Sequence, residues 1–128
     1  MDLKQLNGNM LAFVGDAVLS LQVREYLVGQ AFNTGDKLQK ASVKYVSAKA
    51  QAAFLQYLLE ENHLSEAELL IYKKGRNYKS DSAPKNTDIV TYRQASGLEA
   101  LWGYWYLNQE TKRLKEMFKL FVNYVDKS

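Results

Sequence analysis

The sequence predicts an all-α fold, a bundle of amphipathic helices. Apolar residues recur at spacings of three and four along most of the chain, which is the period of one helix face. No stretch alternates apolar and polar residues as a half-buried strand does, and no internal repeat or low-complexity segment competes with the helical pattern. The only proline, Pro84, falls in a polar stretch between two helical patterns.

Length and composition fit one globular domain that spans residues 1–128. Hydrophobic residues make up 47% of the chain and charged residues 24%, which excludes a disordered protein. No apolar run is long enough and free enough of charge to span a bilayer, so no membrane partner is expected. The N-terminus lacks a basic region followed by an apolar stretch, and the chain has no cysteine, so the expected location is cytoplasmic.

The first half of the chain predicts three helices. The first covers residues 6–28, ends at Gly29, and has a face expected to lie in the core: Leu11, Val14, Val18 and Leu21. A short polar loop leads to a long helix expected over residues 36–60. Ser65 and Glu68 then form a capping-box pattern, in which each side chain satisfies a free backbone N–H at a helix start, so a third helix is expected there.

The second half predicts two more helices. Asn86 or Thr87 is expected to cap a helix whose apolar stretch covers residues 91–107. Trp102 and Trp105 in this stretch would suit a stacking platform for bases, but at helical spacing core and interface packing is the favoured interpretation. A final amphipathic helix places its apolar residues on one face: Leu114, Met117 or Phe118, Phe121, Val122 and Val125.

Two carboxylates interrupt apolar helical stretches. They are Asp16, within residues 11–19, and Glu99, within residues 91–107. An ionised carboxylate on a core helix is costly unless it has a partner. Small residues one turn away leave open space beside each acid: Ala12 and Ser20 for Asp16, and Ala95, Ser96 and Gly103 for Glu99. If the two helices meet, the acids converge on a space for a hard cation with several waters, the usual coordination of magnesium.

Periodicity alone leaves a structural interpretation of these acids open. Each acid would then cap a neighbouring helix or pair with an arginine such as Arg24 or Arg93. Whether the two acidic helices meet decides between a metal site and two separate structural acids.

Positive charge gathers in one polar stretch, although the net charge of +3 is modest. Five cations lie between residues 73 and 85, with Asp81 as the only acid among them: Lys73, Lys74, Arg76, Lys79 and Lys85. Glycine, asparagine, serine and proline in the same stretch favour a loop. This basic loop suits the phosphates of a polyanionic partner, and the alternative is a solvated connector whose lysines only increase solubility.

Three motifs carry a resemblance to a known family. The run Phe13-Val14-Gly15-Asp16-Ala17-Val18-Leu19 resembles the signature of the ribonuclease III endonuclease domain. The run Ser96-Gly97-Leu98-Glu99-Ala100-Leu101-Trp102-Gly103 is similar to the family's second acidic motif. Between them, Gly35-Asp36 and Val46-Ser47, with Ala52 downstream, fall where the family's middle helices begin and turn inward. The motifs occur in the order and at the distances of the family, and together they span most of the chain. The length of the chain resembles that of the Mini-ribonuclease III branch, which lacks a double-stranded-RNA-binding domain.

The resemblance implies a fold and an activity. The fold is a ribonuclease III endonuclease-domain-like helical bundle. The activity is hydrolysis of double-stranded RNA with Mg²⁺, with Asp16 and Glu99 as catalytic residues and metal ligands, leaving a 5′ phosphate and a 3′ hydroxyl. The resemblance also implies a homodimer with two sites facing a shared groove, in which Phe13 inserts into the partner subunit.

The same resemblance implies a biological role. The substrate would be a duplex stem in precursor large-subunit (23S) ribosomal RNA, so the protein would act in rRNA processing and ribosome biogenesis. A ribosomal protein or a pre-ribosomal particle is a further candidate partner.

The chain departs from longer family members at three positions. Their additional carboxylates, one turn before each acid, are replaced by Ala12 and Ser96, and Asn9 stands where their signature begins with glutamate. Waters and substrate phosphate would complete the metal shell, so metal affinity without RNA is expected to be weak. This leaves a second hypothesis, a non-catalytic module that binds structured RNA or ribosomes. The joint presence of Asp16 and Glu99 favours the enzyme, because a binding module has no need of two costly carboxylates in apolar helices.

Overall fold

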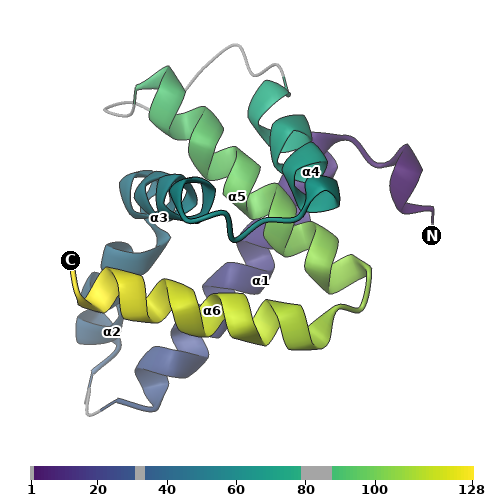
Figure 1. Ribbon diagram of the computed structural model, residues 1–128. Helices are drawn as coiled ribbons and strands as arrows, with labels where there is room; N and C mark the ends of the chain where they lie inside the picture. Colours follow the sequence, from purple (N-terminus) through teal and green to yellow (C-terminus); the bar gives the residue numbers. More distant parts are fainter. Residues whose placement is uncertain (1, 31–33, 79–87) are drawn as a thin grey trace.

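The computed structural model describes residues 2–30, 34–78 and 88–128. In this part of the chain a short 3₁₀ helix, η1 (Leu3–Gln5), precedes six α-helices and no strand forms, which confirms the predicted all-α class. The helices are α1 (Gly8–Val28), α2 (Gly35–Val46), α3 (Ala48–Glu60), α4 (Glu66–Asn77), α5 (Ile89–Leu107) and α6 (Thr111–Asp126). The two ends of the chain lie on opposite sides of the bundle (Figure 1).

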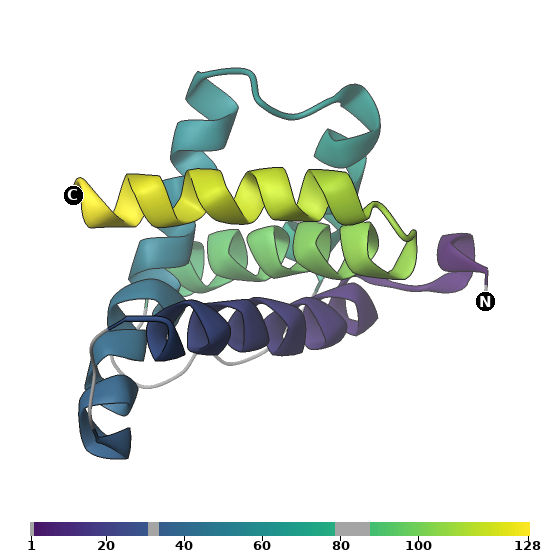
Figure 2. The ribbon, with the colours of Figure 1, turned by 90° about the horizontal axis from the view of Figure 1, so that it is seen from below.

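Helix α5 forms the centre of the bundle. It contacts α1, α3, α4 and α6, and Figure 2 shows it between α1 and α6. Leu98, Leu101, Trp102 and Trp105 of this helix are fully buried. Because neighbours cover α5 on several sides, its apolar residues are not confined to one stripe.

The two tryptophans are core residues, as predicted. Neither is exposed to solvent, which excludes a stacking platform for bases at these positions. Each indole N–H has a partner, since Trp102 Nε1 donates to Gln22 Oε1 and Trp105 Nε1 donates to Glu68 Oε2, both over 2.7 Å. Hydrogen bonding of this kind allows a tryptophan to be fully buried without leaving its donor unsatisfied.

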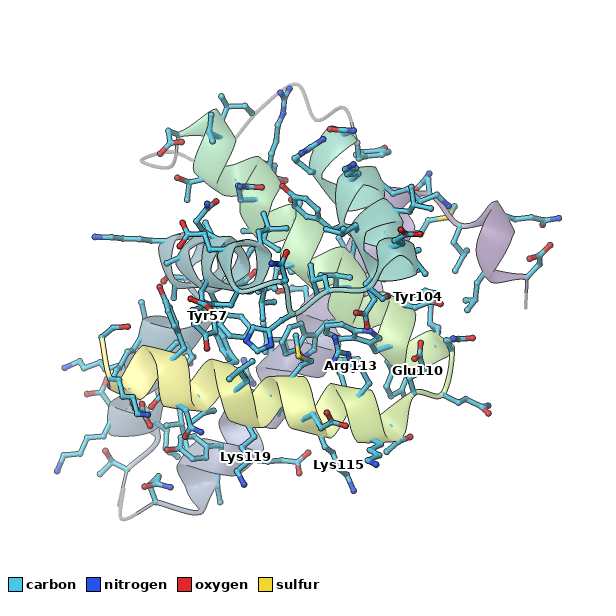
Figure 3. The ribbon with its side chains drawn as sticks, in the orientation of Figure 1. Tyr57, Tyr104, Glu110, Arg113, Lys115 and Lys119 are labelled. Carbon is cyan, nitrogen blue, oxygen red and sulfur yellow. The ribbon has the colours of Figure 1, made fainter. Side chains whose placement is uncertain are left out.

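Helix α6 covers the side of α5 that faces away from α1. Its predicted apolar face is confirmed, with these residues buried: Leu114, Met117, Phe121, Val122 and Val125. Arg113 lies between α6 and the rest of the bundle, whereas Lys115 and Lys119 point away from it (Figure 3). Arg113 Nη2 lies 2.8 Å from Glu68 Oε1, and this ion pair ties α6 to the start of α4.

The backbones of α1 and α5 touch where Gly15 meets Gly103. A Cβ atom on Gly15 would collide with the carbonyl group of Glu99, and a Cβ atom on Gly103 would collide with the carbonyl group of Leu11. Any larger residue at either position would push the two helices apart. This glycine crossing therefore sets the separation of α1 and α5.

Two further glycines hold α4 against the middle of α5. A Cβ atom on Gly75 would lie 2.6 Å from Cβ of Ala100 and 2.7 Å from the carbonyl oxygen of Ser96. A Cβ atom on Gly97 would lie 2.6 Å from the ring of Tyr72. The last turns of α4 are thus fixed close to the part of α5 that carries the second acidic motif.

The predicted single helix over residues 36–60 is wrong, because two helices meet at Ser47. The extended backbone of Ser47 (φ −64°, ψ 150°) ends α2. Its side chain accepts a hydrogen bond from the backbone N–H of Ala50 at 3.2 Å and so caps α3. Helical periodicity continues across this serine, so spacing alone did not reveal the break.

The prediction for α4 is right at its start and wrong at its end. The capping box of Ser65 and Glu68 is confirmed. The helix continues to Asn77, so the basic stretch from Lys73, expected as a loop, begins as the last turns of α4.

The start of α5 also differs from the prediction. Asp88 caps this helix, with its Oδ1 accepting a hydrogen bond from the N–H of Thr91 at 2.8 Å. The predicted caps, Asn86 and Thr87, lie outside the described residues.

The core face predicted for α1 is only partly right. Leu11 is buried, but Val14 and Val18 are half-buried and Leu21 is 58% exposed. The residues that α1 buries are Gly8, Leu11, Ala12, Gly15, Leu19, Val23 and Leu27. Because α1 is apolar on two sides, periodicity did not indicate which side faces the core.

We predict that Gly15→Ala lowers the free energy of unfolding by about 1–3 kcal/mol, because the added methyl group overlaps the backbone of α5. Urea unfolding followed by circular dichroism measures the change. The matched control is Gly35→Ala in α2, where an added Cβ meets nothing within 4 Å. Alanine should leave stability unchanged or raise it by up to ~1 kcal/mol there. Equal stability of Gly15→Ala and the wild type would show that the helices tolerate a wider separation.

Candidate active site

A cavity of about 450 Å³ opens beside the crossing of α1 and α5. The N-terminal segment contributes Leu6, Asn9, Met10, Ala12, Phe13, Val14 and Asp16 to its wall, and α5 contributes Tyr92, Ser96, Glu99 and Leu107. Both acids singled out in the sequence line this one space. The helices that carry them do meet, which was the condition for a shared site.

The glycine crossing accounts for the proximity of the two acids. Gly15 lies against the backbone of Glu99, and Asp16 is the next residue of α1. Gly103 lies one turn after Glu99 and touches α1 on the other side of the crossing. The carboxyl group of Asp16 is close enough to Glu99 to raise the pKa of the Glu99 carboxyl group.

Glu99 is half-buried, and the pKa of its carboxyl group is raised. Burial first, and then the hydrogen bond and negative charge of Asp16, raise the pKa of Glu99 to about 9, whereas the amide of Gln51 acts in the opposite direction. Without a cation, Glu99 therefore holds a proton at neutral pH. A bound divalent ion would compensate both carboxylates and displace that proton.

The expectation that both acids are buried is only partly right. Asp16 is exposed, and Glu99 is half-buried. Asp16 lies on a side of α1 that turns toward the cavity and solvent. Neither acid caps a described helix, since the N-cap residues are Asn7, Thr34, Ser47, Ser65, Asp88 and Glu110. Among the ion pairs of the described residues, none joins either acid to Arg24 or Arg93. The structural interpretation of the acids therefore finds no support in this part of the chain.

The residues around the cavity fit a hydrated magnesium ion. Within the described ranges, no group of three or more His, Cys, Asp or Glu could hold a metal ion. Magnesium, however, is commonly held by one or two carboxylates and keeps several waters. Six waters at about 30 Å³ each occupy roughly 180 Å³, less than half of the 450 Å³ cavity. Ala12 and Ser96 leave this room, and Asn9 adds a neutral side chain able to bind a water or a phosphate.

Two residues at the site were not singled out by sequence reasoning. Tyr92 lines the cavity one turn before Ser96. Gln51, from α3, is buried, and its amide lowers the pKa of the Glu99 carboxyl group. Gln51 did carry a signal, because it is a polar residue within an apolar helical stretch, which is the pattern that identified the two acids.

The structure describes three of the five cations predicted to bind RNA. Lys73 and Lys74 are exposed on the last turns of α4. Arg76 is half-buried, with its guanidinium carbon 5.2 Å from the centre of the Tyr72 ring. The two other cations lie outside the described residues: Lys79 and Lys85.

The outer side of α1 carries an apolar stripe at helical spacing, which we call the α1 stripe. Its large residues are exposed: Met10 by 50%, Phe13 by 80%, Leu21 by 58% and Val28 by 68%. Phe13, predicted to contact a partner subunit, is the most exposed of them and also lines the cavity. An apolar stripe of this kind is typical of a protein–protein contact.

No helix among the described residues is long and apolar enough to cross a membrane.

The chain matches known proteins over nearly its whole length. Residues 9–110 match the Ribonuclease III domain family, and this span includes both acids. The chain is 44% identical over 124 residues to Mini-ribonuclease 3 of Enterococcus faecalis, covering 97% of this chain and 94% of the relative. It is 41% identical over 126 residues to Mini-ribonuclease 3 of Streptococcus pneumoniae, covering 98% of each. Its fold is similar to a crystal structure of a Fusobacterium nucleatum protein, with a TM-score of 0.84 at 29% identity, covering 95% of this chain and 96% of the other.

The raised pKa of Glu99 predicts how stability depends on pH. Between its ordinary value of 4.5 and about 9, the folded state keeps a proton that the unfolded state loses. The folded state then binds more protons, so stability falls as pH rises, by at most about 1.4 kcal/mol per pH unit for one group. In EDTA, Glu99→Gln should escape this loss, and its advantage over the wild type should grow from pH 5.5 to 8.5 in urea unfolding.

The control for this prediction is Glu25→Gln, which replaces an exposed glutamate on α1. Its stability curve should run parallel to that of the wild type. A parallel curve for Glu99→Gln as well would mean that Glu99 loses its proton at ordinary pH.

Proposed function

This chain belongs to the ribonuclease III family, in its Mini-ribonuclease 3 group, and we propose that it cleaves double-stranded RNA with Mg²⁺ at the cavity between α1 and α5. The family makes it an endoribonuclease. The observation that carries the finer proposal is the convergence of Asp16 and Glu99 on one cavity that has room for a hydrated cation and a phosphate.

The residues of the cavity have distinct roles in the proposed reaction. Asp16 and Glu99 would hold Mg²⁺, which when bound supplies an activated water and positive charge beside the scissile phosphate. Glu99 must first give up its proton, because only the ionised carboxylate binds the ion strongly. Ser96 and Asn9 present polar groups to the same space and can orient water or a phosphate oxygen. We propose that the hydrolysis leaves a 5′ phosphate and a 3′ hydroxyl, as the family resemblance implies.

The α1 stripe supports a homodimer as the active form. Asp16 lies near the stripe, and Phe13 belongs to both the stripe and the cavity wall. A second copy packed on this stripe would cover the exposed apolar side chains and bring two cavities to one groove. Two sites in one groove suit a duplex, because each can cut one strand.

The end of α4 is the proposed entry for the RNA backbone. Its glycine contact with Ser96 brings the exposed Lys73 and Lys74 close to the helix that lines the cavity. Lysines interact with phosphates without regard to base sequence, which suits recognition of an A-form duplex by its shape. We propose Lys73, Lys74, Arg76, Lys79 and Lys85 as the RNA-binding set.

We propose a stem of precursor 23S ribosomal RNA as the natural substrate. Relatives named Mini-ribonuclease 3 match the chain over nearly its full length, and the motif resemblance implies this role. Ribosomal proteins or pre-ribosomal particles are then the partners to test, and the cytoplasm is the corresponding location.

The activity is tested by cleavage of a long double-stranded RNA in Mg²⁺. Asp16→Asn and Glu99→Gln should each lower the rate by about 100-fold or more, because charge stabilisation by a bound metal is worth several kcal/mol. Asp36→Asn, which removes a carboxylate whose side chain is 78% exposed on α2, is the matched control and should cleave at the wild-type rate. A wild-type protein that shifts the RNA on a native gel without cutting it would instead be an RNA-binding module.

The dimer is tested by Phe13→Glu, measured by size-exclusion chromatography with light scattering. A charge at the most exposed position of the α1 stripe should convert a dimer to a monomer. Leu70→Glu places the same charge on α4 at a leucine that is 65% exposed, and this control should stay dimeric. A wild-type monomer, or a dimeric Phe13→Glu, would rule out this interface.

A further inference from the structure

Gln51 is a buried polar side chain to which the proposed reaction assigns no role. It is 2% exposed and shares α3 with the fully buried Phe54 and Leu55. Its Nε2 donates to the carbonyl oxygen of Val46 at 3.1 Å. Among the described residues, its Oε1 is the only buried side-chain polar atom without a hydrogen-bond partner.

A half-satisfied amide in a core is destabilising by itself. The lost hydration of Oε1 has no compensation, whereas a leucine of similar volume at this position would leave no polar atom unsatisfied. The bond to the Val46 carbonyl is a partial explanation, because the break at Ser47 leaves carbonyl groups at the end of α2 without helical partners. That bond uses one N–H of the amide and explains neither the second N–H nor the unpaired oxygen.

The Gln51 amide faces Glu99. The rings of Phe54 and Trp102, each one turn beyond these two residues, lie 6.4 Å apart and pack α3 against α5. The Gln51 amide is close enough to the Glu99 carboxyl group to lower its pKa. Glu99 lines the cavity and Gln51 does not, so the amide acts on the carboxyl group from behind the cavity wall.

We propose that Gln51 is a positioning residue for the divalent-ion site, an inference that rests on the proposed function. The carbonyl of Val46 fixes one N–H of the amide, and the amide in turn holds the carboxylate of Glu99 toward Asp16 and the cavity. The direction of this carboxylate matters because Asp16 and Glu99 are the only acids among the described residues that line the cavity. Groups that orient a metal ligand in this way commonly change metal affinity by about 10–100-fold when removed.

The test compares binding of Mn²⁺ without RNA, measured as the rise in melting temperature with MnCl₂ concentration. Gln51→Leu should keep the melting temperature of the metal-free wild type within a few degrees and weaken Mn²⁺ binding by about 10-fold or more. Gln51→Met is the second variant, because its flexible side chain fills the space of glutamine if leucine does not fold. In RNA cleavage, both variants should need a correspondingly higher Mg²⁺ concentration at an unchanged KM for RNA.

Gln22→Leu is the matched control. Gln22 also serves α5, since its Oε1 accepts the Trp102 indole N–H, but it lines no part of the cavity. Removing this glutamine should lower the melting temperature and leave the dissociation constant for Mn²⁺ unchanged. This variant shows what the loss of a purely structural glutamine does.

The outcomes separate this inference from the proposed function. Wild-type Mn²⁺ binding in a folded Gln51→Leu or Gln51→Met, together with its loss in Asp16→Asn, overturns the role of Gln51 and leaves the metal site intact. No Mn²⁺ effect on the wild type even at millimolar MnCl₂, together with no cleavage of RNA in Mg²⁺, overturns both proposals, and so does equal Mn²⁺ binding in Asp16→Asn. Weakened binding in the Gln51 variants but not in Gln22→Leu supports the positioning role.

Discussion

Backbone contact between α1 and α5 at Gly15 and Gly103 is the constraint on which the site depends. Because neither residue has a side chain, the helices approach until Gly15 meets the carbonyl of Glu99. Asp16 follows Gly15 directly, so the approach that packs the helices also brings two carboxylates together. Gly75 and Gly97 extend the same close packing to α4, which carries the basic residues. Packing and function are thus coupled at the same few positions.

The electrostatics of the site follow from this forced proximity. Two carboxyl groups beside one another, one of them half-buried, cannot both be ionised without a cation, and the pKa of Glu99 rises accordingly. A divalent ion would relieve this repulsion, but it must displace the proton of Glu99 to bind. Ala12 and Ser96 limit this repulsion, because two more carboxylates in the same cavity would raise it further. The smaller acid set is therefore less costly to fold, and water and substrate would complete the shell of a bound metal.

Helix α1 serves two surfaces at once. One side carries Gly15 and Leu19 and packs inside the bundle, and the opposite side carries the exposed α1 stripe with Phe13. Asp16 lies between them, at the edge of the cavity. A chain with this arrangement can cover its apolar stripe with a second copy without burying its acid. The proposed dimer contact and the proposed metal site are then adjacent for a geometric reason.

The sequence alone determined the all-α class, the capping box at Ser65, the buried face of α6 and the choice of Asp16 and Glu99, because helical period and polar residues in apolar stretches are local features. It did not determine which face of α1 is buried or that Ser47 divides one helical pattern into two, because the spacing is compatible with either arrangement. Only the tertiary structure showed that Glu99 is partly buried while Asp16 is exposed, and that Gln51 reaches Glu99 from a third helix. Burial and contact between distant residues depend on how closely whole helices pack, and glycine contacts between helices decide that distance.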